Sequence, residues 1–129
     1  MNNEDIILLA KKAMLNSYSP YSNFSVGASL LCSDGSVYTG CNIENVSFGA
    51  TICAERTAIF KAISEGHRNF IKLGIVSSNN DLTFPCGICL QVMLEFMYDS
   101  EIVLEGKNNS IKVFKVNELL PSVFNNFCR

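Results

Sequence analysis

The sequence lacks a large excess of either charge and lacks a long apolar run, and it has only one histidine. The two absences exclude several classes of protein. Its 10 basic and 12 acidic residues give a net charge of −2 and a pI near 5.3. No broad basic surface is therefore available to neutralise the phosphates of a polynucleotide. No apolar run is long enough to cross a membrane. The run over residues 6–10 is too short for a signal peptide, and acidic residues precede it. We therefore expect no nucleic-acid partner, no membrane and a cytoplasmic location.

The sequence does contain enough apolar residues for one core, together with six cysteines. Of its 129 residues, 48% are hydrophobic and 17% are charged, which is typical of a compact globular protein. We expect one domain over residues 1–129. Without a secretory signal, six cysteines indicate reduced thiols, for which metal binding is more common than disulfide formation. The one histidine, His67, follows Gly66 among polar residues, and we expect it to be solvated rather than to bind a metal.

The spacing of apolar residues predicts helices packed on a five-stranded mixed sheet, an α/β layered domain. Helices are expected at residues 4–16, 53–65, 86–98 and 118–124, and strands at 26–32, 36–41, 72–77, 102–104 and 111–114. Asp34-Gly35 predicts a hairpin turn between the first two strands. The connection over 105–110 is too short for a parallel crossover, so the last two strands should be antiparallel. Residues 42–52 show no clear periodicity, and we expect a loop there.

Three cysteines occur at the starts of two predicted helices, in a pattern that binds zinc. Cys53 begins one helix, and Cys86 and Cys89 form a CxxC pair, preceded by Pro85, at the start of another. Unpaired N–H groups at a helix start favour thiolates. The i, i+3 spacing puts both sulfur atoms of the pair on one side of the first turn. Three sulfur ligands leave one position of a tetrahedral zinc ion open, as in catalytic rather than structural zinc sites.

Glu55 and Arg56 follow Cys53 closely, and each has a role at such a site. Glu55 would stand beside the open position, take the proton of the bound water and deliver it to a ring nitrogen and then to the leaving amine. Three thiolates and Zn²⁺ sum to −1, and Arg56 could donate to the sulfur atoms and offset that charge. The bound water would then approach a pKa of about 7.

Less specific interpretations of these residues stay open. A CxxC pair also serves redox chemistry, although that use requires neither a third cysteine nor a glutamate. The zinc could be structural rather than catalytic. Glu55 could be a favourable acid in the first turn of a helix, and Arg56 an ordinary surface cation.

With these motifs the chain resembles the small cytidine deaminases of the homotetrameric type. The CxE and PCxxC spacing with three cysteine ligands is a known signature of zinc deaminases. The likeness extends from about Pro20 to Phe124 and includes the segments NFSVGA from 23, GCNIEN from 40, CAERTA from 53, PCGIC from 85 and ELLP from 118. The resemblance implies a three-layer α/β/α fold and hydrolytic deamination of cytidine and deoxycytidine to uridine and deoxyuridine, with release of ammonia, in pyrimidine salvage. It also implies one zinc ion per subunit, a small nucleoside as substrate, and a symmetric tetramer with shared active sites.

The resemblance further implies a set of substrate-binding residues. Phe24 would pack against the pyrimidine, and the backbone of Ala54 would contact the base. Asn42 and Glu44 would form hydrogen bonds with the ribose hydroxyls. Phe124 would reach the site of a neighbouring subunit. From residue type alone, the two phenylalanines could equally be core aromatics.

Three residues depart from the family's pattern. Leu90 stands where an arginine is common directly after the CxxC pair, and Phe48 stands where a tyrosine is frequent. Val46 replaces a smaller residue in the segment that contains Asn42 and Glu44. We expect activity to survive these changes, with altered affinity or stability.

Three rival functions share the zinc signature. A deaminase of a cytosine-containing antibiotic of the blasticidin S type would have the same metal site, although Asn42 and Glu44 favour a ribose. A polynucleotide-editing deaminase is disfavoured by the low pI and by the antiparallel pair expected for the last two strands. A structural zinc fold, or a relative that only binds its ligand, would not need Glu55 as a proton shuttle.

Overall fold

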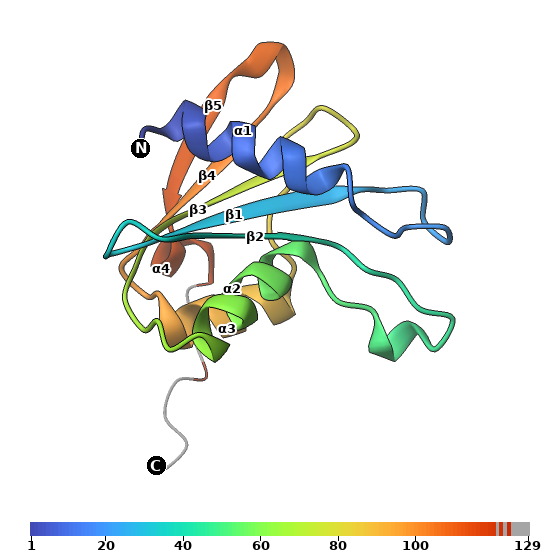
Figure 1. Ribbon diagram of the computed structural model, residues 1–129. Helices are drawn as coiled ribbons and strands as arrows, with labels where there is room; N and C mark the ends of the chain where they lie inside the picture. Colours follow the sequence, from blue (N-terminus) through green and yellow to red (C-terminus); the bar gives the residue numbers. More distant parts are fainter. Residues whose placement is uncertain (121, 123, 125–129) are drawn as a thin grey trace.

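The computed structural model describes residues 1–120, 122 and 124. Its main elements in chain order are α1 Asn3–Met14, β1 Val26–Cys32, β2 Val37–Cys41, α2 Ala54–Ser64, β3 Phe70–Ser77, α3 Gly87–Phe96, β4 Glu101–Glu105, β5 Ile111–Lys115 and α4 Val116–Leu119 (Figure 1). The strands form a five-stranded sheet in the order β2-β1-β3-β4-β5. β3 and β4 are parallel, and the other neighbours are antiparallel. The predicted mixed sheet and the predicted antiparallel final pair are both confirmed.

Helices cover both faces of the sheet, which gives the three layers α/β/α (Figure 1). On one face, Ile7 of α1 packs in a small core with Val76 of the sheet. On the other face, Ile59 of α2 and Met93 of α3 pack in a larger core with Leu30. β1 lies inside the sheet and is buried along its whole length. None of the described helices is long and apolar enough to cross a membrane.

Local capping sets the start of α1 and the end of α2. The side chain of Asn2 accepts a hydrogen bond from the Asp5 N–H at 2.8 Å, and the Asp5 carboxylate accepts one from the Asn2 N–H at 3.0 Å. This capping box starts α1. At the end of α2, Gly66 has a φ of +97°, and the His67 N–H donates to the Ala62 carbonyl at 3.0 Å. This Schellman motif ends α2 and fixes the backbone of His67.

The helix predicted over residues 118–124 is wrong, because α4 spans only Val116–Leu119. The carboxylate of Glu118 accepts a hydrogen bond from the Lys115 N–H at 3.1 Å and so caps an earlier first turn. Leu120 already has an extended backbone, with φ −140° and ψ 95°. It precedes a proline, and the residue before a proline is disfavoured from the helical conformation. Two positions of the predicted helix lie outside the described residues.

The loop expected over residues 42–52 is irregular, but it contains short ordered pieces. A 3-10 turn, η1, spans Phe48–Ala50. Ile43 forms isolated bridges with Tyr18 and Ile52. These pieces bring the loop back to the sheet just before Cys53, where α2 begins.

Gly40 of β2 lies where the sheet meets the first half of α2. A Cβ atom at this position would lie 2.5 Å from the carbonyl oxygen of Ala54 and 2.6 Å from the amide nitrogen of Ala58. Both atoms belong to the helix backbone, so no side-chain rearrangement can relieve the overlap. Glycine therefore allows the start of α2, next to Cys53, to lie directly against the sheet.

We expect Gly40→Ala to lower the free energy of unfolding by about 3 kcal/mol, because the helix backbone has to move. The displacement also moves the start of α2, so zinc binding should weaken. Urea unfolding and the zinc content of the purified protein measure the two effects. Gly49→Ala is the matched control, because a Cβ atom there meets no atom within 4 Å. Similar losses in both variants would contradict the close-approach argument.

Candidate active site

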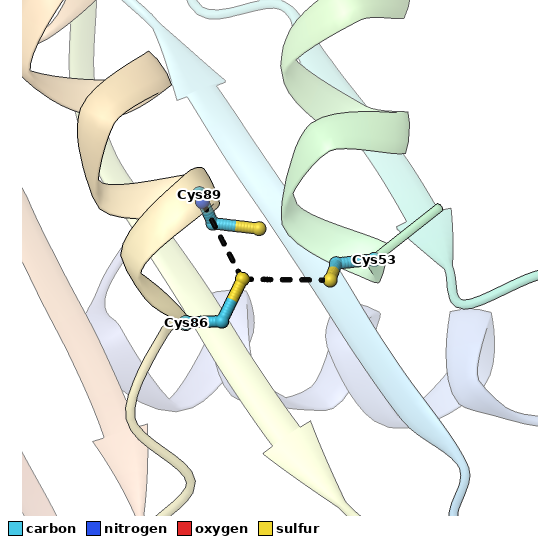
Figure 2. Close-up of side chains that lie close together, drawn as sticks. All are labelled: Cys53, Cys86 and Cys89. Atoms are coloured by element: carbon cyan, nitrogen blue, oxygen red, sulfur yellow. Dashed lines mark hydrogen bonds between the residues drawn. The ribbon is translucent and has the colours of Figure 1, made fainter. Parts of the chain in front are cut away.

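The three cysteines predicted to bind zinc lie together between the first turns of α2 and α3 (Figure 2). Cys53 is the N-cap of α2, Cys86 is the N-cap of α3, and Cys89 lies in the first turn of α3. The Sγ atoms of Cys53 and Cys86 are 3.8 Å apart, and all three Sγ atoms lie within 4.8 Å of one another. Sulfur ligands on a tetrahedral zinc ion, with bonds of about 2.3 Å, are about 3.8 Å apart. The cluster could therefore hold one zinc ion.

The starts of the two helices also favour the thiolate form that zinc requires. The Sγ atom of Cys86 accepts a hydrogen bond from the Cys89 N–H at 3.5 Å. A hydrogen bond from the Cys89 thiol lowers the pKa of Cys53 to about 5, and Arg56 and Cys86 act in the same direction. The pKa of Cys89 is raised, because it donates to Cys53 and is buried. At neutral pH the cluster thus already holds a thiolate, the metal-binding form of cysteine.

Arg56 contacts the cluster as expected for a residue that balances its charge. Its Nη2 atom donates to the Sγ atom of Cys53 at 3.4 Å, and its Nε atom is buried without a hydrogen-bond partner among the described residues. Leu90, by contrast, is buried in the larger core. The positive charge beside the sulfur atoms therefore comes from α2.

Glu55 lies beside the cluster and is 4% exposed. Burial raises the pKa of its carboxyl to about 7, the charge of Cys53 adds to the shift, and Arg56 opposes it. A carboxyl with this pKa can both accept and donate a proton at neutral pH. Among the described residues, no histidine, carboxylate or further thiol joins the three sulfur atoms. The Glu55 carboxylate is therefore not part of this group of possible metal ligands.

A cavity of about 190 Å³ opens beside the cluster. Its wall includes Phe24, Asn42, Ala54 and Glu55, which the sequence predicts, together with Cys53 and Cys86. It also includes residues that the sequence reasoning missed: Thr51, Ile52, Thr83 and Phe84. These four residues directly precede Cys53 or the Pro85-Cys86 pair. Their position next to the predicted ligands could have identified them from the sequence.

The side chain of Asn42 forms hydrogen bonds with several segments around the cavity. It is 7% exposed, and its Oδ1 atom accepts hydrogen bonds from the Val26 N–H at 2.9 Å and from the Ser17 hydroxyl. Its Nδ2 atom donates to the Phe24 carbonyl at 2.8 Å. The amide group Nδ2 carries a second hydrogen in addition to the one in this bond. Asn42 thus positions Phe24 and offers one donor.

Glu44 lies in an adjoining cavity rather than in the one beside the cysteines. That cavity, of about 380 Å³, is lined by Tyr21, Ser22, Glu44, Phe48 and Thr51, and Thr51 belongs to both cavities. The Glu44 carboxylate accepts hydrogen bonds from the N–H groups of Tyr21 at 2.9 Å and Ser22 at 3.2 Å. The hydrogen bond with the Ser22 side chain contributes most to lowering the pKa of Glu44. Glu44 is therefore a fixed anion next to the site.

Phe124, also predicted as a site residue, is not among the residues that line either cavity. Its carbonyl accepts a hydrogen bond from Nε2 of Gln91 at 2.5 Å, and the residue is 58% exposed. Val46 and Phe48, two of the residues that depart from the family's pattern, are also largely exposed. These apolar side chains lie on the surface of the chain.

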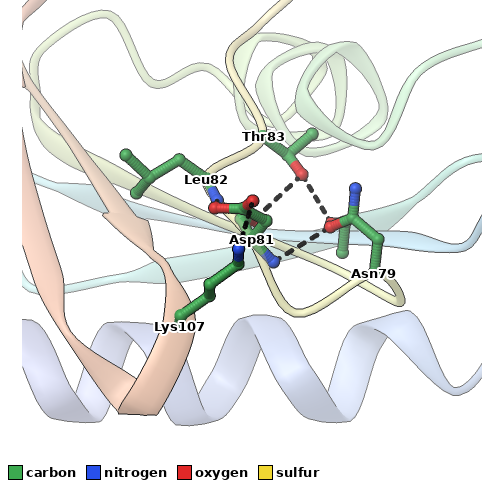
Figure 3. A network of polar contacts seen from close by, with 6 residues as sticks. Asn79, Asp81, Leu82, Thr83 and Lys107 are labelled. Atoms are coloured by element: carbon green, nitrogen blue, oxygen red, sulfur yellow. Dashed lines mark hydrogen bonds and ion pairs between the residues drawn. The ribbon is translucent and has the colours of Figure 1, made fainter.

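A polar network fixes the loop that leads to the CxxC pair (Figure 3). The Oδ1 atom of Asn79 accepts a hydrogen bond from the Asp81 N–H at 3.0 Å. The Thr83 hydroxyl donates to the Asp81 carbonyl at 3.3 Å. The Asp81 carboxylate lies 3.8 Å from the Lys107 ammonium, on the connection between β4 and β5. The loop is thus anchored at several points, which positions Thr83 and the following Cys86.

This fold and this cluster define a zinc-binding domain of the deaminase class. Residues 1–105 match the family model for the cytidine and deoxycytidylate deaminase zinc-binding region, and the chain belongs to this family. Over 125 residues it is 46% identical to a cytidine deaminase of Sporosarcina psychrophila, covering 96% of this chain and 92% of the relative. It is equally similar to a cytidine deaminase of Halalkalibacterium halodurans, covering 96% of this chain and 95% of the relative.

Solved structures give the same result. A crystal structure of cytidine deaminase from Burkholderia pseudomallei superposes with a TM-score of 0.92 at 42% identity, over 96% of this chain and 100% of the other. That from Mycobacterium tuberculosis superposes with a TM-score of 0.84 at 34% identity, over 98% and 99%. The predicted three-layer fold and the resemblance stated from the motifs are confirmed.

Proposed function

We propose that this chain is a cytidine deaminase, which hydrolyses cytidine and deoxycytidine to uridine and deoxyuridine with release of ammonia. The observation that carries the proposal is the buried carboxyl of Glu55 beside three converging sulfur atoms, at the wall of a cavity. The relatives named cytidine deaminase support the choice of substrate.

Each residue of the cluster has a defined task in this reaction. Cys53, Cys86 and Cys89 would hold the zinc ion, which when bound supplies a Lewis acid that activates water for attack on C4 of the base. Glu55 would pass one proton of the attacking water to N3, and would then pass the second proton, from the oxygen added at C4, to the leaving amine. Its pKa of about 7 suits both directions of transfer. Arg56 would balance the negative charge of the thiolates through its contact with Cys53.

The cavity walls support a nucleoside with its base near the sulfur atoms. Phe24 would pack on the flat face of the pyrimidine, and the backbone of Ala54 would contact its polar edge. The second Nδ2 hydrogen of Asn42 and the carboxylate of Glu44 would bind the ribose hydroxyls. Thr51, which lines both cavities, lies where the base-binding and ribose-binding regions would meet.

We further propose that four copies assemble with shared active sites, and that Phe124 of one copy completes the site of its neighbour. Val46, Phe48 and Phe124 are exposed apolar side chains, which contacts between copies would bury. Residues 1–129 would act as one domain, in the pyrimidine salvage that this reaction serves. Because three thiolate ligands require reduced cysteines, we place the protein in the cytoplasm.

Zinc analysis of the purified protein, alongside a cytidine-to-uridine assay, tests the proposal. We expect one zinc ion per chain at the three cysteines. We also expect cytidine and deoxycytidine to lose their cytosine absorbance at least about 100-fold faster than blasticidin S, because the site is built to bind a ribose. Slow turnover of cytidine with fast turnover of blasticidin S would identify the antibiotic as the substrate instead. Salt-sensitive binding of RNA or single-stranded DNA would favour the polynucleotide alternative. Light scattering checks the tetramer.

A further inference from the structure

A second cluster of metal-ligating side chains lies at the far end of α2 from Cys53. It consists of Cys32 at the end of β1, Asp34 in the β1–β2 turn and His67 just after α2. The thiol sulfur, one carboxylate oxygen and one ring nitrogen all lie within 4.8 Å of one another. The deamination proposed above uses none of these three residues.

Local hydrogen bonds fix the backbone of all three residues without help from a metal. The Cys32 N–H donates to the Ser36 carbonyl at 2.8 Å, and the Cys32 carbonyl accepts from the Gly35 N–H at 3.0 Å. The Asp34 Oδ1 atom accepts from the Ser36 N–H at 2.9 Å. His67 is held by the Schellman motif that ends α2. The backbone of Cys32 and His67 and the carboxylate of Asp34 are therefore held in place without a metal ion.

The distance between Asp34 and His67 fits two ligands of one ion better than a direct hydrogen bond. The Asp34 Oδ2 and His67 Nδ1 atoms are 3.6 Å apart, beyond the hydrogen-bond range of about 2.7–3.2 Å. Oxygen and nitrogen ligands on a tetrahedral zinc ion, with bonds of about 2.0–2.2 Å, are about 3.4 Å apart. Because Oδ1 is engaged by Ser36, Oδ2 is the oxygen available to an ion.

The donor set matches the charge of a divalent cation. Cys32 is fully buried, and the Asp34 side chain is 56% exposed. Tyr38 packs on the His67 ring, with the ring centroids 5.2 Å apart. One thiolate, one carboxylate and one neutral imidazole together balance a charge of +2. Binding would require the Cys32 thiol proton to leave to solvent as the metal–sulfur bond forms.

We propose that Cys32, Asp34 and His67 form a second metal site, which takes a borderline divalent cation such as Zn²⁺ through one sulfur, one oxygen and one nitrogen atom. A mixed set of this kind suits zinc rather than magnesium or calcium, which prefer oxygen ligands. The ion enters from the side of the exposed Asp34 and ties the β1–β2 hairpin to the end of α2. Its effect is structural, because the catalytic cluster lies at the other end of α2.

Equilibrium dialysis of the zinc-loaded enzyme against Co²⁺, with metal analysis of both ions, tests the proposal. We expect one further equivalent of metal per chain, with sulfur-to-cobalt charge-transfer absorption from Cys32. Asp34→Asn and His67→Gln should each lower the affinity for this further metal ion by more than about 100-fold. Loss of a ligand lowers metal affinity more than loss of an outer-shell partner, which lowers it roughly 10- to 100-fold. Cys32→Ser should also remove the charge-transfer absorption.

Cys41→Ser and Asp81→Asn are the matched controls, because they make the same kinds of change outside the cluster. Cys41 is a cysteine of β2, and Asp81 is a carboxylate with a lysine partner. Both variants should still bind the further equivalent of metal. Asp34→Asn and His67→Gln are close to isosteric at partly exposed positions, so they should fold and keep their cytidine turnover. A single equivalent in the wild type would overturn the proposal and leave Asp34 and His67 as an ion pair. A further equivalent that survives all three ligand substitutions would also overturn it. Either result leaves the proposed deaminase function intact.

Discussion

Glu55→Gln should fold and bind zinc, yet deaminate cytidine roughly 10³- to 10⁴-fold more slowly than the wild type. An amide of the same shape fills the buried position but cannot carry one proton of the water to the base and the other to the leaving amine. General acid–base catalysis is typically worth 10² to 10⁴-fold. The loss should be in kcat rather than in KM, because the proton transfers occur in the chemical steps. Steady-state kinetics and metal analysis of the same preparation measure both properties.

The thermal stability of this variant gives an independent check on the role of Glu55. The carboxyl is 4% exposed, and its burial raises its pKa to about 7. The charged form of Glu55 therefore destabilises the folded state. Replacing it with a neutral amide should leave the Tm unchanged or higher. Glu65→Gln, at the exposed C-cap of the same helix, is the control and should keep full turnover. Normal turnover by Glu55→Gln would mean that Glu55 has been assigned the wrong role.

The parts of the fold that could be predicted from the sequence are those whose boundaries depend on local signals. β1 Val26–Cys32 has the predicted bounds, because turn-forming residues precede it and Asp34-Gly35 follows it. α1 begins where the Asn2 capping box allows. α4 was not predictable in the same way, since its first residue, Val116, is buried and donates its N–H to the Ser100 carbonyl at 3.0 Å. That contact depends on the packing of distant segments.

The same distinction separates the two cysteine-containing clusters. Cys53, Cys86 and Cys89 could be grouped from the sequence because each lies at a predicted helix start within a known spacing pattern. Cys32 and His67 have no such pattern, so the sequence does not group them. Cys32 is buried in the larger core, and His67, expected to be solvated, is partly buried. The His67 side chain is 22% exposed, because the β1–β2 hairpin folds against the end of α2 and brings Asp34 and Tyr38 onto the ring.

Cys86→Ala should lose zinc and unfold at a clearly lower temperature than the wild type. It removes one of three protein ligands, and we expect zinc affinity to fall by more than about 100-fold. Metal binding that occurs only in the folded state stabilises that state, so the lost ligand also costs stability. The Cys86 sulfur additionally caps α3 by accepting the Cys89 N–H, and a lost cap costs about 1 kcal/mol. Zinc analysis and thermal unfolding measure the two losses.

A chelator separates the metal contribution from the loss of the cap. In a His67→Gln background, which weakens the second metal site, stripping zinc should lower the Tm of the enzyme with all three cysteines and of the control Cys41→Ala. It should leave the Tm of Cys86→Ala almost unchanged, because that variant has lost the zinc site at the helix starts. Cys86 is suited to this test because it is exposed, whereas Cys89 is buried. Truncation of Cys89 would add a core cavity to the loss of the ligand. A chelator response of Cys86→Ala equal to that of the enzyme with all three cysteines would show that zinc is held by other residues, and the cluster at the helix starts would no longer explain the chemistry.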